Sequence, residues 1–389
     1  MIHRIVKPLE SNSFFLFGAR GTGKSTFLKD YFASEKVLWI DLLDPLQEEQ
    51  YALHPNSLKE EIAQQEPPWV VIDEIQKVPK LLDVVHQLIE NSKKKVLFAL
   101  TGSSARKLKR GAANLLAGRA FMNHLFPLTA VEFGSHFNLM EVLRWGTLPK
   151  ITQLSTDEEK TAFLKTYALT YLKEEVWAEH VVRRLDPFRK FLEVAAQTSG
   201  ELVNYTNIAR DVGADTKTVQ SYFQILEDTL VGFSLNPYHR SIRKQQHQAP
   251  KFYFFDIGVK RALDHTLSQE IVPNTYGFGK TFEHFVILEA HRLNEYYQKD
   301  FQFYYLQTKD GAEIDLIVER PGKPIALIEI KSTERVDERD AKTIELFLKD
   351  FPNKFGPPQG FCFSRDPKPK KIGNVQALPW EMGLKEIGL

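Results

Sequence analysis

Residues 18–25 read Gly18-Ala19-Arg20-Gly21-Thr22-Gly23-Lys24-Ser25. This octapeptide fits the pattern G-x-x-x-x-G-K-[ST] of a phosphate-binding loop. The apolar run 13–17 before it has strand character, and the aromatic residues and Leu28 within 26–32 after it recur at helical spacing. The stretch therefore predicts a strand, a glycine loop and a helix in direct succession.

Each residue type in the loop has a physical reason. The glycines allow backbone dihedral angles that would strain other residues, so that successive N–H groups curl around an anion at a helix N-terminus. Lys24 adds a mobile positive charge for the β- and γ-phosphates, and the Ser25 hydroxyl can ligate Mg²⁺. We expect the nucleotide to contact Gly18, Ala19, Arg20, Gly21, Thr22, Gly23, Lys24, Ser25 and Thr26. The alternative is a glycine turn that matches the pattern by chance.

A second stretch supports a nucleotide site. Residues 69–72 read Trp-Val-Val-Ile and lead into Asp73 and Glu74, as expected of a buried parallel strand that delivers carboxylates to its C-terminal edge. Asp73 would hold Mg²⁺, directly or through water, and Glu74 would polarise the attacking water. Taken alone, the same residues could be a strand followed by a polar turn.

Length and composition set the frame. The chain has 389 residues, which favours two or three domains. Hydrophobic residues make up 43% and charged residues 26%, as in an ordinary globular protein. The formal net charge is +1, so the molecule as a whole has no strong field that attracts nucleic acid. Any nucleic-acid surface must therefore be a local patch.

Cysteine content and targeting signals indicate where in the cell the protein is expected. Cys362 is the single cysteine, which excludes an intramolecular disulfide and an all-cysteine metal site. Its neighbours Phe361 and Phe363 indicate a buried small apolar side chain. The N-terminal residues lack the apolar core of a signal peptide, and no apolar run approaches the about 20 residues of a membrane span. We expect a soluble, cytoplasmic protein with no membrane partner.

Strands and helices alternate from residue 1 to about 128. Strands are expected at 37–41, 69–73 and 95–100, and helices at 56–65 and 80–91. Residues 95–100 lead into the polar end Thr101-Gly102-Ser103-Ser104. The pattern predicts a doubly wound parallel sheet whose functional loops gather at the C-terminal ends of the strands.

The loop, the Ile72-Asp73-Glu74 strand end and the Thr101 strand end, followed by Gly118-Arg119 and Phe126-Pro127-Leu128-Thr129, resemble the AAA+ fold. More narrowly, they resemble a prokaryotic ATPase family whose C-terminal half is a domain of unknown function. The resemblance implies that Thr101 is a sensor that orients the attacking water and that Arg119 is a candidate arginine finger, with Arg106 as a competitor. From the residues alone, Thr101 could equally have a packing role and Arg119 could pair with a carboxylate. A finger that acts in trans would imply a homo-oligomer.

Residues 129–186 change to a helical pattern without strands. Four residues recur at helical spacing, namely Tyr167, Tyr171, Leu172 and Val176. We interpret them as core rather than as a base-stacking surface, and the segment as a helical lid over the ATPase core, residues 1–128.

Residues 187–256 predict a winged helix, both by pattern and by resemblance. A helix at 188–198 precedes helices at 205–212 and 216–228, with Gly213 in the turn, and strands at 230–236 and 251–255 follow. The outward face of the last helix would carry Lys217, Thr218, Gln220, Ser221 and Gln224. A basic wing of Arg240, Arg243, Lys244 and Lys251 could contact phosphate. The alternative is a protein-docking module with a solvated basic loop.

Residues 257–389 contain a separate set of charged residues. Strands are expected at 301–306, 312–318 and 326–331, and Asp315, Glu329 and Lys331 form the pattern D-x(13)-E-x-K. Glu283 is expected in the first turn of a helix that begins at 281. The pattern resembles the PD-(D/E)xK nuclease-like fold, which implies that Glu283, Asp315 and Glu329 hold Mg²⁺ or Mn²⁺ and that Lys331 positions or deprotonates water. The alternative is a strand surface with an ion pair that binds nothing.

The predicted fold is thus an α/β protein with an AAA+-like P-loop NTPase sheet, a helical lid, a winged helix and a restriction-endonuclease-like α/β domain. Two functions follow from it. In the first, a Mg²⁺-dependent ATPase drives or licenses a nuclease-like, DNA-directed domain. In the second, ATP switches a binding or scaffold module whose nuclease-like domain is not catalytic. ATP and Mg²⁺ are the expected cofactors in both.

Overall fold

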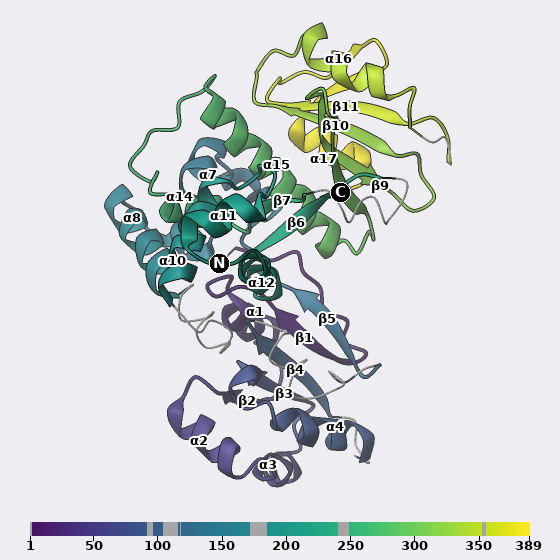
Figure 1. Cartoon of the computed structure of the whole chain (residues 1–389). Coiled ribbons are helices and arrows are strands. Elements are labelled where there is room, and N and C mark those ends of the chain that lie inside the picture. The colour runs from purple at the N-terminus through teal and green to yellow at the C-terminus, as the bar shows by residue number, and fades with distance from the viewer. Residues whose placement is uncertain are drawn as a thin grey trace.

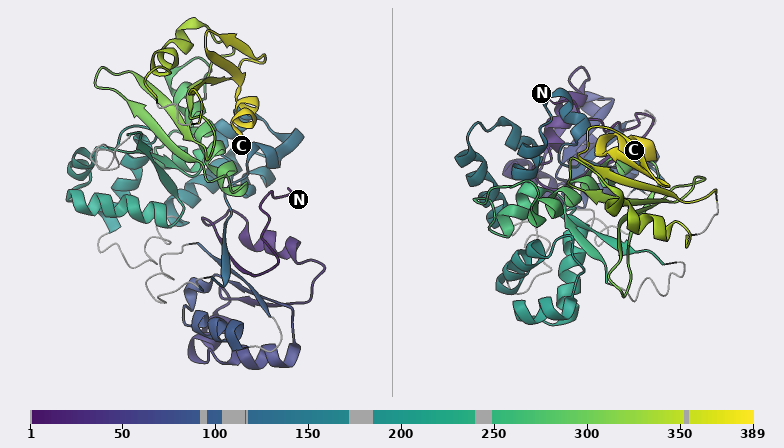
Figure 2. Two further views of the ribbon diagram at one scale, coloured as in Figure 1. Left: turned by 90° about the vertical axis from the view of Figure 1, so that its right-hand side faces the viewer. Right: turned by 90° about the horizontal axis from the view of Figure 1, so that it is seen from above.

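The computed structural model describes residues 2–91, 96–103, 116, 118–171, 185–239, 249–351 and 355–389. The N-terminal sheet lies at one end of the molecule and the C-terminal strands lie at the other, with helices from the middle of the chain between them (Figure 1). The two further views in Figure 2 show the same separation of the N-terminal and C-terminal parts.

The N-terminal sheet has five parallel strands in the order β2-β3-β4-β1-β5. The strands are β1 (Ser13–Phe17), β2 (Val37–Asp41), β3 (Trp69–Asp73), β4 (Leu97–Gly102) and β5 (Ala120–His124). The first four confirm the predicted doubly wound sheet. β5 was not predicted, because it is an edge strand in which Phe121 and Met122 are exposed and Asn123 is polar. It therefore lacks the continuous apolar run of its neighbours.

Helices cover both faces of this sheet. α1 (Lys24–Tyr31) packs Leu28 against the face that carries Phe14 and Leu16. The opposite face, which carries Phe15 and Phe17, is covered by α2, α3 and α4. Their bounds are Pro45–Leu53 for α2, Ser57–Gln65 for α3 and Leu81–Asn91 for α4. α2 was not predicted, since only Tyr51 is buried in it.

The segment after β5 is helical, as predicted, over its described residues 130–171. It contains α6, α7, α8 and a π-helical turn, with bounds Ala130–Phe133, Leu139–Trp145, Asp157–Thr166 and Tyr167–Tyr171. Tyr167 is buried, which confirms its place in the core. Leu172 and Val176 lie outside the described residues, as does the side chain of Tyr171.

In the described residues 185–239 and 249–254, three helices and a hairpin follow. They are α10 (Leu185–Gln197), α11 (Tyr205–Val212), α12 (Thr216–Asp228) and the antiparallel pair β6 (Gly232–Pro237) and β7 (Lys251–Phe254). α12 buries Val219, Phe223 and Leu226 and exposes Lys217 and Gln220, as expected.

The prediction that Lys251 belongs to a basic wing that contacts phosphate is wrong. This residue is buried, with 2% of its surface exposed, and its ammonium group pairs with Glu283 and Glu313. It is therefore not available to an external phosphate. The other three residues of the wing, Arg240, Arg243 and Lys244, lie outside the described residues.

The second sheet has the order β12-β13-β11-β10-β9-β8-β6-β7. Its further strands are β8 (Gln302–Gln307), β9 (Glu313–Glu319), β10 (Ala326–Lys331), β11 (Gln359–Ser364), β12 (Lys370–Ile372) and β13 (Val375–Pro379). β6 pairs with β8 at Asn236 and Pro237, so the sheet continues across the expected domain boundary at residue 256. Cys362 is buried in β11, which confirms its expected environment.

The described residues after β7 also form four helices: α14 (Ile257–Leu263), α15 (Tyr276–Tyr296), α16 (Glu338–Phe347) and α17 (Trp380–Ile387). α15 begins at Tyr276 and not at 281, because Thr275 caps it by accepting a hydrogen bond from Phe278 N–H. Glu283 therefore lies in the interior of α15 rather than in its first turn. No helix in the described part of the chain combines the length and apolar character needed to cross a bilayer.

Candidate functional site

The glycine loop joins β1 to α1 at the C-terminal edge of the parallel sheet. Gly21 and Gly23 have φ of 79° and 92°, which lie in the left-handed region that favours glycine. A Cβ atom at Gly18 would lie 2.3 Å from the carbonyl oxygen of Leu125. The structure thus requires glycine at all three positions, and the loop has the cradle shape expected for a phosphate.

Lys24 and Glu74 face each other at the mouth of this loop. The Lys24 ammonium donates a hydrogen bond to Gly18 O at 2.8 Å and lies 3.8 Å from Glu74 Oε1. Lys24 is 6% exposed. A nucleotide phosphate that enters the loop would draw the ammonium away from a neutral carbonyl toward a stronger anionic partner.

Glu74 has an unusual backbone conformation, with φ 59° and ψ 48° in the left-handed region. Its N–H donates to Thr101 Oγ1 at 3.0 Å, and the Thr101 hydroxyl in turn donates to Asp73 Oδ1. Left-handed non-glycine residues are costly and cluster at functional sites. Thr101 therefore ties Asp73 to the Glu74 backbone and helps to hold the conformation of Glu74. Its expected role in orienting water remains a prediction.

Gln76 is a site residue that sequence reasoning missed. Its amide nitrogen donates to Glu74 Oε2 and lies 3.3 Å from Ser103 Oγ. Among the described residues, its amide oxygen is buried without a hydrogen-bond partner. It follows Glu74 by two positions in a short 3₁₀ turn, Ile75–Lys77, and no recognised motif marks it. Gln76 therefore orients the carboxylate that we expect to act on water.

The predicted magnesium ligands at this edge are Ser25, in the first turn of α1, and Asp73, at the end of β3. A hydroxyl and a carboxylate are hard oxygen donors, which suit Mg²⁺. Asp73 is 2% exposed, and a carboxylate so deeply buried needs a cation or hydrogen bonds as compensation. The donor chemistry therefore fits Mg²⁺ as part of a Mg²⁺–nucleotide complex.

Arg119 lies at the other end of the sheet. It precedes β5, whose first residue Ala120 aligns with Ser13, whereas the loop follows the last residue of β1. Its guanidinium pairs with Glu90 of α4. Arg119 thus cannot reach the loop of its own chain, and a finger role in trans remains a prediction. Arg106 lies outside the described residues.

The second set of predicted residues comes together on β9 and β10. Asp315 Oδ2 accepts a hydrogen bond from Ile330 N–H at 2.7 Å, and the Lys331 ammonium pairs with Glu329 Oε1. Glu329 is 7% exposed, and its Oε2 atom has no hydrogen-bond partner among the described residues. An unpartnered carboxylate oxygen in a buried position is a candidate cation ligand.

The pKa shifts of Asp315 and Glu329 also indicate a position that favours a cation. Burial raises the pKa of Asp315 well above its usual range, and the charges of Glu329 and Glu283 raise it further. Burial also raises the pKa of Glu329, although Lys331 opposes that shift. Burial lowers the pKa of Lys331, but the two carboxylates outweigh it and raise the pKa above its usual value. Asp315 and Glu329 therefore form a site that a cation would stabilise.

Glu283 differs from Glu329 because both of its carboxylate oxygens have partners. Its Oε1 accepts a hydrogen bond from the Tyr253 hydroxyl at 3.1 Å and lies 3.6 Å from the Lys251 ammonium. Its Oε2 pairs with Lys280 at 3.1 Å. Both oxygens thus already have cationic or hydroxyl partners. Across the described ranges, no three His, Cys, Asp or Glu side chains come close enough together to hold a metal ion. Metal ligation by Glu283 remains a prediction that would require these contacts to break.

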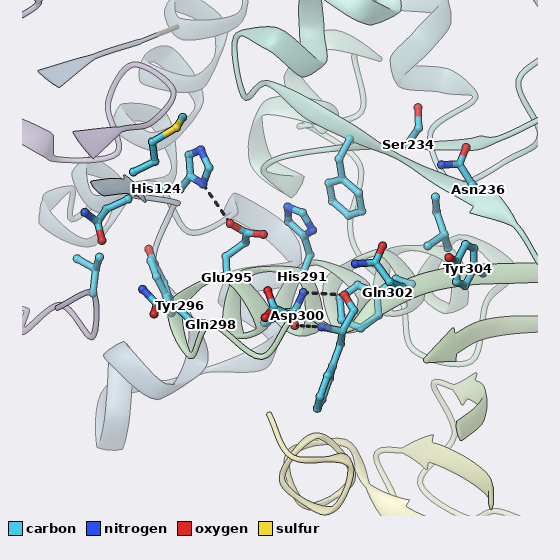
Figure 3. A pocket seen from close by; sticks show the side chains of 18 of the residues that line it. His124, Ser234, Asn236, His291, Glu295, Tyr296, Gln298, Asp300, Gln302 and Tyr304 are labelled. Carbon is cyan, nitrogen blue, oxygen red and sulfur yellow. Dashed lines mark hydrogen bonds and ion pairs between the residues drawn. The ribbon is translucent and has the colours of Figure 1, made fainter. Parts of the chain in front are cut away.

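A cavity of about 910 Å³ lies between the two sheets. It is lined by residues of β5, β6, β8 and the end of α15, including His124, Asn236, Tyr296 and Gln302 (Figure 3). His124 Nδ1 and Glu295 Oε2 are 3.1 Å apart and join β5 to α15. None of its described lining residues belongs to the glycine loop, so this cavity is separate from the predicted phosphate site.

A parallel sheet with a glycine loop between β1 and α1, and with carboxylates at the end of β3 on the far side of β4, has the features of a P-loop domain. More particularly, residues 10–134 match the family model described as an AAA domain. The N-terminal part of the chain is thus similar to AAA domains over these residues. Residues 136–270 and 278–382 match two models described as domains of unknown function, DUF8612 and DUF4143.

Two curated relatives are uncharacterized. Rv2008c of Mycobacterium tuberculosis and Mb2031c of Mycobacterium bovis are each 30% identical to the chain over 267 residues, which cover 68% of this chain and 58% of the relative. The chain thus spans little more than half the length of these relatives. A solved structure, the replication initiator DnaA bound to AMPPCP and single-stranded DNA, has a TM-score of 0.29 and 15% identity, covering 56% of this chain and 82% of that chain.

Proposed function

We propose that the chain is a Mg²⁺-dependent AAA+-like ATPase that binds and hydrolyses ATP. The observation that carries this proposal is the meeting of Lys24 and Glu74, 3.8 Å apart, at the mouth of the glycine loop. One group is suited to bind phosphate and the other to act on water. Lys24 begins α1 after β1, and Glu74 follows β3, which β4 separates from β1 in the sheet. Both side chains reach the same edge of the sheet, which supports attack on a terminal phosphate there.

The residues would share the work as follows. The loop N–H groups hold the β-phosphate, and the Lys24 ammonium moves from Gly18 O to the β- and γ-phosphates. Glu74, oriented by Gln76 and by its Thr101-bound backbone, accepts a hydrogen bond from the attacking water and increases its nucleophilicity. Ser25 and Asp73 would hold Mg²⁺, which neutralises charge on the phosphate oxygens.

This proposal is tested by calorimetry and by a phosphate-release assay with purified protein. We expect heat of binding when Mg²⁺ and ATP or ADP are present together, and release of phosphate from ATP. Removal of Mg²⁺ with EDTA should lower hydrolysis to background, because the charge of the triphosphate is then uncompensated. Absence of any adenine or guanine nucleotide binding in the presence of Mg²⁺ would refute the proposal.

A second candidate function concerns the C-terminal half. We propose that Asp315, Glu329 and Lys331 form a nuclease-like phosphodiester site that the ATPase controls and that acts on DNA. The unpartnered, buried Oε2 atom of Glu329 favours this function. Asp315 and Glu329 would hold Mg²⁺ or Mn²⁺, and the Lys331 ammonium would position water or stabilise charge on the phosphate. The alternative is a nucleotide-switched binding module in which the same residues do no chemistry.

A cleavage experiment distinguishes the nuclease-like site from the binding-module alternative. We expect the wild type to cleave single-stranded or duplex DNA with Mn²⁺ and ATP, and Lys331→Ala to reduce the rate at least about tenfold by removing an electrostatic stabiliser. Lys342→Ala is the matched control, because Lys342 is exposed on α16. If no cleavage occurs with any nucleotide while DNA or protein binding persists, the binding-module alternative is correct.

A further inference from the structure

Four backbone carbonyl groups of the glycine loop accept hydrogen bonds from side chains. Gly18 O accepts from the Lys24 ammonium at 2.8 Å, and Ala19 O accepts from the Thr22 hydroxyl at 2.9 Å. Arg20 O accepts from the Tyr167 hydroxyl at 2.6 Å. Thr22 O accepts from the Arg4 guanidinium at 2.8 Å. Two of these four donors, Tyr167 and Arg4, come from outside the phosphate-binding motif.

The direction of a carbonyl decides the direction of the next N–H group. A peptide unit is planar and trans, so its C=O and N–H point to opposite sides. Holding Arg20 O against Tyr167 therefore turns the Gly21 N–H away from Tyr167. Holding Thr22 O against Arg4 likewise turns the Gly23 N–H away from Arg4. We infer that both N–H groups face the inside of the loop, where an anion would bind.

The surroundings of Tyr167 fix the position of the hydroxyl that donates to Arg20 O. It is 1% exposed and begins the π-helical turn Tyr167–Tyr171, a kind of turn found often at functional sites. A Cβ at Gly21 would lie 3.3 Å from the Tyr167 ring, so the ring packs directly on the loop. Rings of Phe163 and Phe255 lie 6.2 Å from it and fix its position in the core of the helical segment.

The Arg4 guanidinium is fixed by four hydrogen bonds. It is 8% exposed, and its guanidinium donates to Glu132 Oε1 at 2.8 Å, to Phe126 O at 2.6 Å and to the Tyr296 hydroxyl at 3.0 Å, besides Thr22 O. Glu132 lies in α6, the first helix of the helical segment, and Tyr296 ends α15. The Tyr296 oxygen also accepts from Phe126 N–H at 2.9 Å. The contact of Arg4 with the loop thus depends on residues far along the chain.

We propose that Tyr167 and Arg4 are positioning residues of the nucleotide site, which set the loop N–H groups toward the phosphates and bind the loop to the helical segment and to α15. This inference rests on the proposed nucleotide function and adds the regulation of that same site. The Mg²⁺–ADP affinity of the AAA domain depends on helices outside it. A partner or ligand that moves the helical segment or α15 would change that affinity.

The test compares single-atom variants. Tyr167→Phe removes the hydroxyl that holds Arg20 O, and Tyr296→Phe removes the hydroxyl that supports Arg4. We expect Tyr167→Phe to raise the Kd for Mg²⁺–ADP about fivefold to tenfold, which is the loss of one hydrogen bond, and Tyr296→Phe to raise it less. The kcat for ATP should stay within about twofold at saturation, because Glu74 and Lys24 are not displaced.

Tyr31→Phe is the matched control, because the Tyr31 hydroxyl bonds Pro8 O and Glu10 in the same domain and does not contact the loop. Its Kd should equal that of the wild type. Equal Kd values for Tyr167→Phe, Tyr296→Phe and wild type would overturn the inference, as would equal losses of affinity in all three variants including Tyr31→Phe. A wild type that binds no Mg²⁺–ADP refutes the proposed function itself, which is a distinct result.

Arg4 can be tested without removing its charge. Arg4→Lys keeps a cation beside the buried carboxylate of Glu132 but cannot make all four contacts of the guanidinium. We expect a rise in the Kd for Mg²⁺–ADP at least as large as that of Tyr296→Phe, with near-ultraviolet circular dichroism like that of the wild type. A folded Arg4→Lys protein with wild-type affinity would contradict the role of Arg4.

Discussion

The Glu74→Gln variant is expected to bind ATP as the wild type does and to hydrolyse it roughly 10²- to 10⁴-fold more slowly, the usual effect of losing a general base. A glutamine side chain has nearly the shape of glutamate and can still accept a hydrogen bond from Gln76, so the loop and its contacts should be unchanged. What is lost is the negative charge that polarises the attacking water. Single-turnover hydrolysis and Mg²⁺–ATP calorimetry measure the two effects separately.

Glu60→Gln is a suitable control for that variant. Glu60 is exposed on α3, so the same chemical change should leave both binding and hydrolysis at wild-type values. Hydrolysis by Glu74→Gln at the wild-type rate would show that Glu74 is not the base. A loss of ATP binding in Glu74→Gln would instead mean that the left-handed turn at Glu74 is needed to shape the loop.

The Lys24→Ala variant is expected to lose most of its affinity for Mg²⁺–ATP, by roughly 10- to 150-fold. This loss of affinity is the one expected when a hydrogen bond that involves a charged group is removed. Lys24 is the buried cation at the mouth of the loop, and the triphosphate would have no equivalent partner without it. Calorimetric titration gives the affinity, and thermal unfolding without nucleotide shows whether the domain stays folded.

Lys29→Ala provides the comparison for Lys24→Ala. Lys29 lies on the same helix, α1, but is exposed and extends over the Trp39 ring rather than toward the loop. We expect its affinity to match that of the wild type. A Lys24→Ala protein that binds Mg²⁺–ATP as tightly as Lys29→Ala would be incompatible with the phosphate-binding role of Lys24.

Local chemistry made much of the proposed nucleotide site predictable. Gly21 and Gly23 adopt the positive φ that the motif requires, and β3 delivers Asp73 and Glu74 to the expected edge of the sheet. The same holds for β10, where strand alternation predicts that Glu329 and Lys331 share one face, and their side chains form an ion pair. In each case a short stretch of chain carries both the secondary structure and the functional side chain.

Other features were not predictable, because their cause lies in distant parts of the chain. Lys251 was expected in a basic wing, but its strand β7 pairs with β6 at the edge of the second sheet, and its ammonium group pairs with Glu283 and Glu313 instead of facing solvent. Burial lowers the pKa of Lys251, yet these carboxylates raise it above its usual value, so the lysine stays charged. A single sequence shows its charge but not its partners.

The sequence by itself determined the phosphate loop, the order of strand, loop and helix around it, and the identity of the acidic strand end, because dihedral preference and periodicity act over a few residues. Only the tertiary structure decided that Tyr167, Arg4 and Tyr296 support that loop. Their hydrogen bonds join residues separated by 147, 18 and 292 positions. Contacts over such distances depend on how whole helices pack, and no local pattern in the chain records them.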